Sequence, residues 1–318
     1  MGSLPVILDM DPGVDDALAM MLALGSPEIE VLGISTVHGN VPLGVGTQNA
    51  LRVLGLLDRT GVPVYPGAAR PLVRGPVYAT EVHGPEGLGE AVLPDPDVPP
   101  AGDGVGFLVE TLSARPGEVT LVAVGPLTNL AMAEQQVPGV LREARQVIVM
   151  GGAIKQPGNS TPTAEFNFYA DPDAAGQVVR SGASLTLMPL DVTRRVGLDV
   201  EGIQHRVAPP GTPEARFVEA AVQSSIAYAK RVYGYAGIYL HDPLAVGLAI
   251  DPSFFKLAPV FLEVETEGRL TAGQAVADRR PFLEDANRQG HRVMCAVEVE
   301  AERFLEWFLE RALEEVGH

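Results

Sequence analysis

Four aspartates surround a Pro-Gly turn near the start of the chain, between an apolar run and a helix-forming run. The turn reads Leu-Asp-Met-Asp-Pro-Gly-Val-Asp-Asp-Ala, and its acidic residues are Asp9, Asp11, Asp15 and Asp16. Residues 4–8 are short and apolar, as a buried strand would be, and residues 17–24 strongly favour a helix. The cluster is therefore predicted where a strand ends and a helix begins, which is where open α/β sheets bind ligands.

Carboxylates this close repel one another, and burial would increase the repulsion. The macrodipole of the following helix offsets only ~0.3–1 kcal/mol per carboxylate, whereas burying an ion costs several kcal/mol. A hard divalent cation such as Ca²⁺ or Mg²⁺ prefers oxygen ligands and would balance the cluster better. The alternative is a solvated acidic turn with an N-capping aspartate, although a cap needs one aspartate and this turn has four.

Composition and charge limit the class of protein and its partners. The 46% hydrophobic and 20% charged content is typical of water-soluble globular proteins, and no leader-like segment or membrane-length apolar run is present. Cys295 is the only cysteine, which excludes an internal disulfide and fits the cytoplasm. A net charge of −17 argues against nucleic acid or an anionic membrane as partner. With three lysines and no Gly-rich phosphate loop, a polyphosphate substrate is not expected.

Apolar strand-like runs alternate with helical patterns along most of the chain. The expected strands cover residues 5–8, 31–37, 119–124, 146–150 and 185–189. The expected helices cover residues 15–25, 44–58, 103–114, 127–136, 171–181 and 213–231. This alternation predicts the α/β class, with an open, mostly parallel sheet, helices on both faces and a Rossmann-like core. Because no repeat or linker is visible, we expect a single domain over residues 1–318.

Three segments depart from the alternation. Beyond about residue 255 we expect short β-like runs (260–264 and 293–299) and then an amphipathic helix within 298–315. The apolar stripe of that helix should lie in the core: Phe304, Leu305, Phe308, Leu309, Ala312 and Leu313. The Pro- and Gly-rich segment 66–104 has the length of a functional lid or a disordered loop. Segment 223–242 carries four tyrosines and ends in His241-Asp242.

Polar groups follow several expected strands at their C-terminal ends. They lie in the motifs His38-Gly39-Asn40, Gly125 to Asn129, Gly151-Gly152 and Asn159 to Asn167. Because the strands of a parallel sheet end at one edge, these groups should converge with the aspartate turn, and convergence makes an active site credible. The alternative is local: the glycines form plain turns, the asparagines cap helices or turns, and His83 and His241 are structural. Two histidines and extra carboxylates also suit general acid chemistry and metal ligation.

Taken together, these motifs resemble the inosine-uridine nucleoside hydrolase family. The matching segments come in the family's order: Asp9 to Ala17, His38 to Asn40, Val124 to Asn129, Met150 to Ala153, Asn159 to Pro172, and His241-Asp242. They span residues 5 to about 250, and the resemblance is weak beyond 255. It implies a calcium-dependent enzyme that hydrolyses the N-glycosidic bond of ribonucleosides of the pyrimidine or inosine type. The products would be free base and ribose.

The resemblance also implies roles for individual residues. The Ca²⁺ ligands would be Asp11, Asp16, the carbonyl oxygen of Val124, and Asp242. Asp15 would be the general base that activates a water molecule, and His241, with His83 nearby, would be the candidate acid for the leaving base. The remaining contacts would come from Asn40, Asn159, Glu165 and Asn167 to the ribose hydroxyls, Met150 to the sugar, and Tyr233, within the tyrosine-rich segment, to the base.

Some features depart from the family pattern or leave questions open. Met10 replaces a small polar or sulfhydryl residue, but its side chain should face away from the metal. Ser160 replaces a larger apolar residue and could loosen the pocket wall. The lone tryptophan, Trp307, lies in the last helix, which argues against a tryptophan-stacked purine pocket and leaves the base preference open. The family resemblance suggests a homodimer or homotetramer.

The chemistry agrees with this interpretation, and two alternatives make different predictions. Cleavage of an N-glycosidic bond passes through an oxocarbenium-like state, whose positive charge an anionic pocket stabilises more than the ground state. A phosphatase of the haloacid dehalogenase type would share Asp-x-Asp, but it needs a later lysine and would leave the Asn/Glu/Asn cluster without a role. A non-catalytic ribose- or Ca²⁺-binding module would bind ribonucleosides without turnover.

Overall fold

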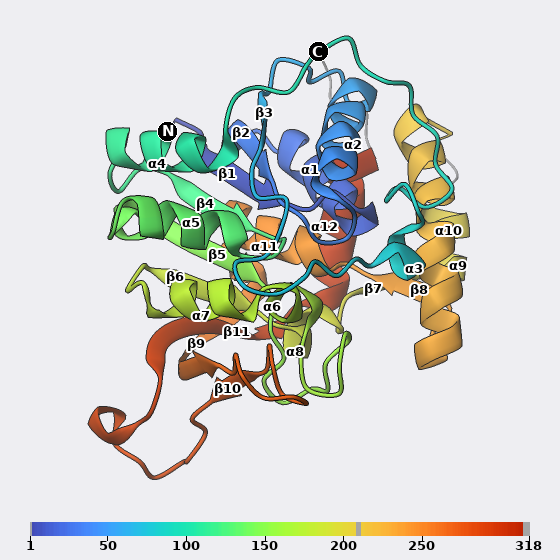
Figure 1. Ribbon diagram of the computed structural model, residues 1–318. Helices are drawn as coiled ribbons and strands as arrows, with labels where there is room; N and C mark the ends of the chain where they lie inside the picture. Colours follow the sequence, from blue (N-terminus) through green and yellow to red (C-terminus); the bar gives the residue numbers. More distant parts are fainter. Residues whose placement is uncertain (1, 208–210, 314–318) are drawn as a thin grey trace.

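A nine-stranded sheet runs through the part of the chain that the computed structural model describes, residues 2–207 and 211–313. Its strand order is β10-β9-β11-β6-β5-β4-β1-β2-β3 (Figure 1). The strands are β1 (Leu4–Met10), β2 (Ile29–Thr36), β3 (Val64–Pro66), β4 (Thr120–Ala123), β5 (Gln146–Met150), β6 (Leu185–Met188), β9 (Phe255–Val264), β10 (Ala275–Ala277) and β11 (His291–Val299). Strands β1 to β6 and β11 pair in parallel, whereas β9 and β10 are antiparallel additions at one edge.

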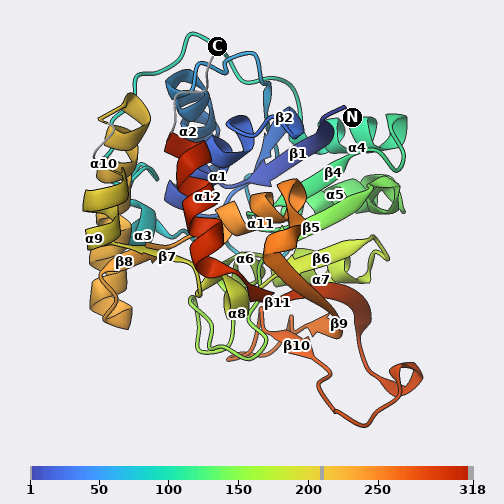
Figure 2. The ribbon, with the colours of Figure 1, turned by 180° about the vertical axis from the view of Figure 1, so that it is seen from behind.

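Helices cover both faces of this sheet. The longer ones are α1 (Val14–Leu24), α2 (Leu43–Leu56), α4 (Gly104–Ala114), α5 (Thr128–Gln136), α7 (Pro172–Arg180), α10 (Pro213–Tyr233), α11 (His241–Ile250) and α12 (Ala301–Leu313). The short ones are α3 (Thr80–His83), α6 (Phe166–Ala170), α8 (Leu190–Thr193) and α9 (Val200–Gly202). Helices α4, α5 and α7 pack on one face, while α1, α11 and α12 pack on the other (Figures 1 and 2).

Two apolar clusters, one on each face, form the core. Strand β1 shows the alternation that produces them, because Val6 and Leu8 point into one cluster and Ile7 into the other. Helix α12 contributes its whole predicted apolar stripe to the larger cluster. The sheet is therefore buried on both faces, as expected for a parallel sheet with helical crossovers.

Local signals explain where several helices begin and end. The Asp103 side chain accepts hydrogen bonds from the backbone N–H groups of Val105 and Gly106 and so caps α4. Thr212 caps α10, which ends at Gly234 with a positive φ of 69° that glycine adopts without strain. These signals explain why the helix boundaries predicted from periodicity agree with the structure to within about two residues.

The predicted α/β class is confirmed, and the C-terminal third corrects several details. Strands β9 and β11 are longer than the short runs expected there. The last helix begins at Ala301 rather than near 298, because residues 298 and 299 belong to β11, and positions 314–315 lie outside the described residues. Helix α11 was not predicted, because it is buried almost all round and lacks an amphipathic pattern. The single-domain organisation stays a prediction. No helix in the described ranges is long and apolar enough to cross a membrane.

Candidate active site

The aspartate turn lies where β1 ends and α1 begins, at the sheet edge predicted from the sequence. Asp11 and Asp16 are almost fully buried. The Asn40 backbone N–H donates to Asp11 Oδ2 at 2.6 Å, and its side-chain amide donates to Asp16 Oδ2 at 3.0 Å. Asp16 also accepts from the N–H groups of Asp11 and Gly13, at 3.1 and 2.9 Å. The loop after β2 therefore fixes the carboxylates of the turn after β1.

Glycines allow the chain to approach Asp11 closely. A Cβ atom on Gly125, just after β4, would lie 2.8 Å from Asp11 Oδ1, and one on Gly39 would collide with Asp11 Oδ2. Real Cβ atoms do not approach a fixed oxygen this closely, so any side chain at either position would displace the carboxylate. These glycines are thus required by close approach, not only as turn residues.

Asp242, at the start of α11, joins the turn and completes an acidic cluster. One carboxylate oxygen from each of Asp15, Asp16 and Asp242 lies within 4.8 Å of the others. Asp11, expected as a ligand, is not one of these three residues, and its backbone N–H donates to Asp16 Oδ1 at 3.1 Å. Burial raises the pKa of Asp16 to about 7 and that of Asp15 to about 6. Burial and the neighbouring carboxylates raise the pKa values of Asp11 and Asp242 well above the usual range.

This donor set fits a hard divalent cation. Among the described residues, Asp11 Oδ1 and Asp15 Oδ1 are buried without a hydrogen-bond partner, and an unpaired buried carboxylate oxygen is costly. The Val124 carbonyl, at the end of β4, accepts a 2.6 Å hydrogen bond from the Asn167 amide, and a carbonyl oxygen has a second lone pair. Clustered carboxylate and carbonyl oxygens are what Ca²⁺ and Mg²⁺ bind.

The loop between β5 and α6 and the first turn of α6 carry three more of the predicted site residues, Asn159, Glu165 and Asn167. Glu165 is buried and accepts from the backbone N–H groups of Gly152, Asn167 and Phe168 at 3.0, 2.9 and 3.2 Å. Burial nevertheless raises its pKa to about 7. Asn159 Oδ1 accepts from the Phe166 N–H at 2.9 Å. The asparagines and the glutamate thus organise their own loop as well as facing the cavity.

The two histidines each use one ring nitrogen within the protein. His83 Nδ1 accepts from the Val14 N–H at 3.0 Å and lies 3.8 Å from Asp15 Oδ1. His241 Nδ1 lies 2.7 Å from Thr193 Oγ1. Burial lowers the pKa of His83 to about 4, and burial together with the positive charge of Arg194 lowers that of His241 to about 3. Both imidazoles are therefore neutral near pH 7.

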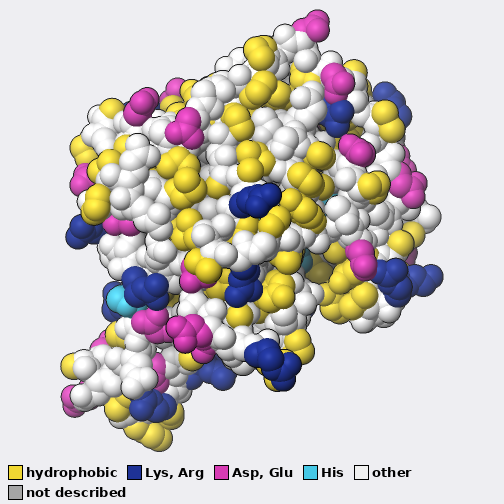
Figure 3. Space-filling view, viewed as in Figure 1, with side chains coloured by type: hydrophobic (Ala, Val, Ile, Leu, Met, Phe, Trp, Pro, Cys, Tyr) yellow, Lys and Arg dark blue, Asp and Glu magenta, His cyan; other side chains and the backbone are white. Residues whose placement is uncertain are grey.

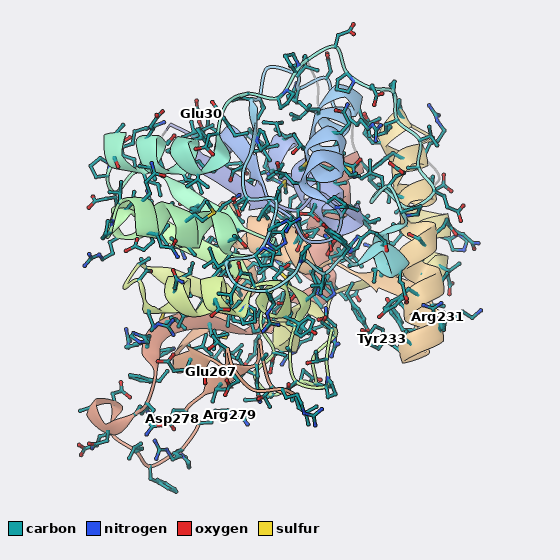
Figure 4. The ribbon with its side chains drawn as sticks, in the orientation of Figure 1. Glu30, Arg231, Tyr233, Glu267, Asp278 and Arg279 are labelled. Carbon is teal, nitrogen blue, oxygen red and sulfur yellow. The ribbon has the colours of Figure 1, made fainter. Side chains whose placement is uncertain are left out.

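These groups meet in a cavity of about 320 Å³. The predicted residues that line it are Asp15, Asn40, His83, Val124, Met150, Asn159, Glu165, Asn167, Tyr233, His241 and Asp242. Asp11 and Asp16 are not part of the lining and lie in the turn beside it. The surface is hollowed between the central loops and α10 (Figure 3), and Tyr233 lies at the end of α10 near α3 (Figure 4). Part of the segment 66–104, including α3, contributes to this wall, as a lid would.

Sequence reasoning overlooked two charged residues of this wall, Glu81 and Arg194, and two polar residues of its motifs, Asp9 and Asn129, lie outside the wall. Arg194 lines the cavity, but it follows the short helix α8 and belongs to no motif. Asp9, one of the four crowded aspartates, is not part of the acidic cluster, because it accepts hydrogen bonds from Ser35 Oγ and Asn129 Nδ2 within the core. Asn129 does not cap α5, since its amide also donates to the Thr36 carbonyl.

The three departures from the family pattern have clear positions. Met10 is fully buried in the larger apolar cluster, away from the carboxylates. Ser160 lines the cavity. Trp307 packs against Phe254 and Phe304 at ring-centroid distances of 5.0 and 5.7 Å and does not line the cavity.

Comparisons with known proteins agree on one family. Residues 6–306 match the family model described as inosine-uridine preferring nucleoside hydrolase. The chain is 42% identical to an uncharacterized protein of Schizosaccharomyces pombe over 86% of this chain and 88% of that protein. It is 37% identical to the pyrimidine-specific ribonucleoside hydrolase RihA of Citrobacter koseri, over 97% and 98% of the two chains. The structure of a purine-preferring ribonucleoside hydrolase from Gardnerella vaginalis is similar, with a TM-score of 0.90, 32% identity, and 98% and 99% coverage.

Proposed function

Because this chain belongs to the inosine-uridine preferring nucleoside hydrolase family and is a ribonucleoside N-glycosidase, we propose that it uses Ca²⁺ to hydrolyse ribonucleosides of the pyrimidine or inosine type. The observation that carries the proposal is the buried acidic cluster beside a cavity of nucleoside size. Burial raises the pKa values of several of these carboxylates, so their charged forms are costly without a cation, and their oxygens suit calcium. The S. pombe, C. koseri and G. vaginalis relatives do not share one stated base preference, so uridine, cytidine and inosine are all candidate substrates.

Asp11, Asp16, the Val124 carbonyl oxygen and Asp242 would hold the ion. When bound there, Ca²⁺ supplies an anchor for the ribose diol and lowers the pKa of a bound water. Asp15 takes the proton of the attacking water, because its carboxylate lines the cavity and carries an unpartnered oxygen. Asn40, Asn159, Glu165 and Asn167 bind the ribose hydroxyls, and Met150 contacts the sugar.

The base occupies the other end of the cavity, between His83, Tyr233 and His241. Negative charge at the sugar end stabilises the oxocarbenium-like sugar in the transition state more than the neutral substrate. His241 is oriented by the contact of its Nδ1 with Thr193 Oγ1. Its imidazole is neutral near pH 7, so it is the candidate donor of the proton on Nε2 to the departing base. A homodimer or homotetramer in the cytoplasm completes the proposal.

The test is hydrolysis of uridine, cytidine and inosine by the purified protein, followed by the release of reducing sugar. Dialysis against a chelator should abolish activity, and added Ca²⁺ should restore it; full activity after chelation would refute the metal role. Asp15→Asn should reduce kcat by about 10²–10⁴-fold, the usual contribution of a general base. The matched control is Asp58→Asn, which changes an exposed aspartate with a positive φ of 53° that asparagine tolerates.

A second assay separates the diol role from general binding. 2′-Deoxyuridine lacks one of the two hydroxyls that the ion would anchor, so it should be a much poorer substrate than uridine. Equal rates on the two sugars would refute the diol role. Binding of uridine with no turnover would instead support a non-catalytic ribose-binding module.

A further inference from the structure

The charged groups of the cavity are distributed unevenly. Asp15, Glu165 and Asp242 come from the sheet edge, where the ribose is proposed to bind. The fourth carboxylate of the lining, Glu81 of α3, is exposed and pairs with Arg231. Among the described residues that line the cavity, Arg194 is the one lysine or arginine. Its guanidinium carbon lies 5.5 Å from the ring centroid of Tyr233, in the wall assigned to the base. The cavity is thus negative at the sugar end and carries a cation beside the base.

The Arg194 side chain is held in place but keeps its charge available. Its Nη1 donates to the Pro157 carbonyl at 3.0 Å, and its Nη2 donates to the Gly158 carbonyl at 3.2 Å. These bonds use two of the five guanidinium N–H groups. None of the ion pairs found within residues 2–207 and 211–313 involves Arg194, whereas Arg231, which does not line the cavity, pairs with Glu81 at 3.0 Å. Arg194 is therefore a fixed cation that has no carboxylate partner in the part of the chain that the structure describes.

The reaction separates charge in the same direction. The C1′–N bond breaks with its electron pair going to the base nitrogen, so the sugar becomes positive and the base negative. The oxygen of water bonds to C1′, and the water's proton passes to Asp15 and then to solvent. The base finally takes up a proton, which gives ribose and free base. Fixed dipoles or charges placed where charge develops are the largest single contribution in many enzymes.

Resting on the proposed function, we propose that Arg194 is a catalytic residue that stabilises the negative charge developing on the departing base. His83 and His241 each have one ring nitrogen engaged with Val14 and Thr193, which leaves one nitrogen for the base. Arg194 retains its charge at any working pH. It lowers the barrier by electrostatic stabilisation, and its effect is largest for the bases that leave least readily.

The dependence on the leaving group distinguishes this role from a structural one. Uridine and inosine release poor leaving groups, whereas p-nitrophenyl β-D-ribofuranoside releases a stable anion from the same sugar. The experiment measures kcat and KM for all three substrates with wild-type enzyme, Arg194→Met, Arg194→Lys and the control Arg195→Met. Arg195 is the adjacent arginine, and its side chain is exposed and bonds to the Asp191 carbonyl rather than lining the cavity.

We expect Arg194→Met to lower kcat for uridine or inosine by about 10²-fold or more, the usual loss on removing one such stabilising group. The loss for the p-nitrophenyl riboside should be less than about fivefold, because its leaving group needs little stabilisation. Arg194→Lys keeps the charge and should recover part of the lost rate. Arg195→Met should match wild type on all three substrates.

Equal losses on all three substrates would overturn the inference, because they would assign Arg194 to holding the 157–160 loop and Tyr233. An unchanged kcat on uridine and inosine would also overturn it. If the wild-type enzyme cleaves none of the three ribosides, the proposed function itself fails, and this inference fails with it. Activity of the wild type with an equal loss in the variant refutes the Arg194 role alone.

Discussion

Asn129→Ala should destabilise the protein far more than a typical asparagine substitution. Asn129 is fully buried, and its Nδ2 donates to Asp9 Oδ2 at 2.8 Å and to the Thr36 carbonyl at 3.0 Å. Its Oδ1 accepts from the Ala68 N–H at 2.7 Å. The substitution leaves three buried groups without this partner. The side chain therefore connects β1, β2 and the loop after β3.

The expected loss in the free energy of unfolding is about 2–4 kcal/mol. The Ala68 N–H loses its partner outright, which costs ~1–3 kcal/mol, whereas Asp9 Oδ2 keeps Ser35 Oγ and the Thr36 carbonyl keeps the Gly67 N–H. Each of these two lost bonds costs ~0.5–1.5 kcal/mol, so the sum is ~2–6 kcal/mol. A water molecule in the vacated space would satisfy part of this, which favours the lower half of the range. The loop packs closely, because a Cβ on Gly67 would collide with the Asn129 side chain.

Urea unfolding followed by the fluorescence of Trp307 measures this loss. Trp307 is half-buried against Phe254 and should report global unfolding. Gln135→Ala is the matched control, since Gln135 is an exposed amide on the same helix and bonds only to Gln177 among the described residues. The control should change stability by less than about 0.5 kcal/mol. A loss below about 1 kcal/mol for Asn129→Ala, or a loss equal to that of the control, would show that Asn129 does not hold β1, β2 and the loop after β3 together.

Asn129→Asp adds a pH test of the same contact. Burial raises the pKa of Asp9 to about 7, so the folded state binds this proton more tightly than the unfolded chain. The resulting stability is present below the unfolded pKa of about 4 and is lost as the pH rises to about 7. A second carboxyl at position 129 strengthens this dependence, because one proton can bridge the pair only at lower pH. The cost of Asn129→Asp should be larger at pH 8 than at pH 5, and equal costs would contradict the argument.

Three further predictions concern the site and the core. Gly125→Ala places a Cβ 2.8 Å from Asp11 Oδ1. This clash costs ~1–3 kcal/mol and should weaken the binding of Ca²⁺, measured by calorimetry, by about tenfold or more. An unchanged affinity for Ca²⁺ would contradict the close approach of Gly125 to Asp11. Burial raises the pKa of the Cys295 thiol to about 12. Iodoacetamide at pH 8 should therefore modify this thiol only when the protein is unfolded in urea. Rapid labelling of the folded protein would contradict this prediction. Thr193→Val removes the contact with His241 Nδ1 and should lower kcat about tenfold without changing the melting temperature. An unchanged kcat would show that this contact does not orient the imidazole.

Periodicity predicted most of the helices and the first parallel strands because it records which side of each element is buried. Strand order is a different kind of information, because it depends on how far-apart segments pack. Nothing in the local pattern of 291–299 indicates that β11 pairs in parallel with β6, or that β9 then pairs with it in antiparallel. Helix α11 was missed for a related reason, since a helix buried on all sides shows no amphipathic period.

The site was predictable where a motif follows a strand and much less so elsewhere. Asp15, Asn40 and Asn167 line the cavity because parallel strands end at one edge. The positions of Asp9 and Asn129 depended on which way each side chain points, which only the packed structure shows. Arg194 follows the short helix α8 and reaches the cavity through contacts with the 157–158 carbonyls, so no spacing in the sequence indicates it.

The acidic cluster takes its members from opposite ends of the chain, since Asp15 and Asp16 belong to the first helix and Asp242 to the eleventh. During synthesis on the ribosome, the first helix emerges long before the residue that completes the cluster. A nascent chain therefore cannot capture an ion in this cluster until most of the sheet has assembled. An ion bound as proposed would therefore be acquired late in maturation, and the fraction of protein that holds it would measure the fraction that is fully folded.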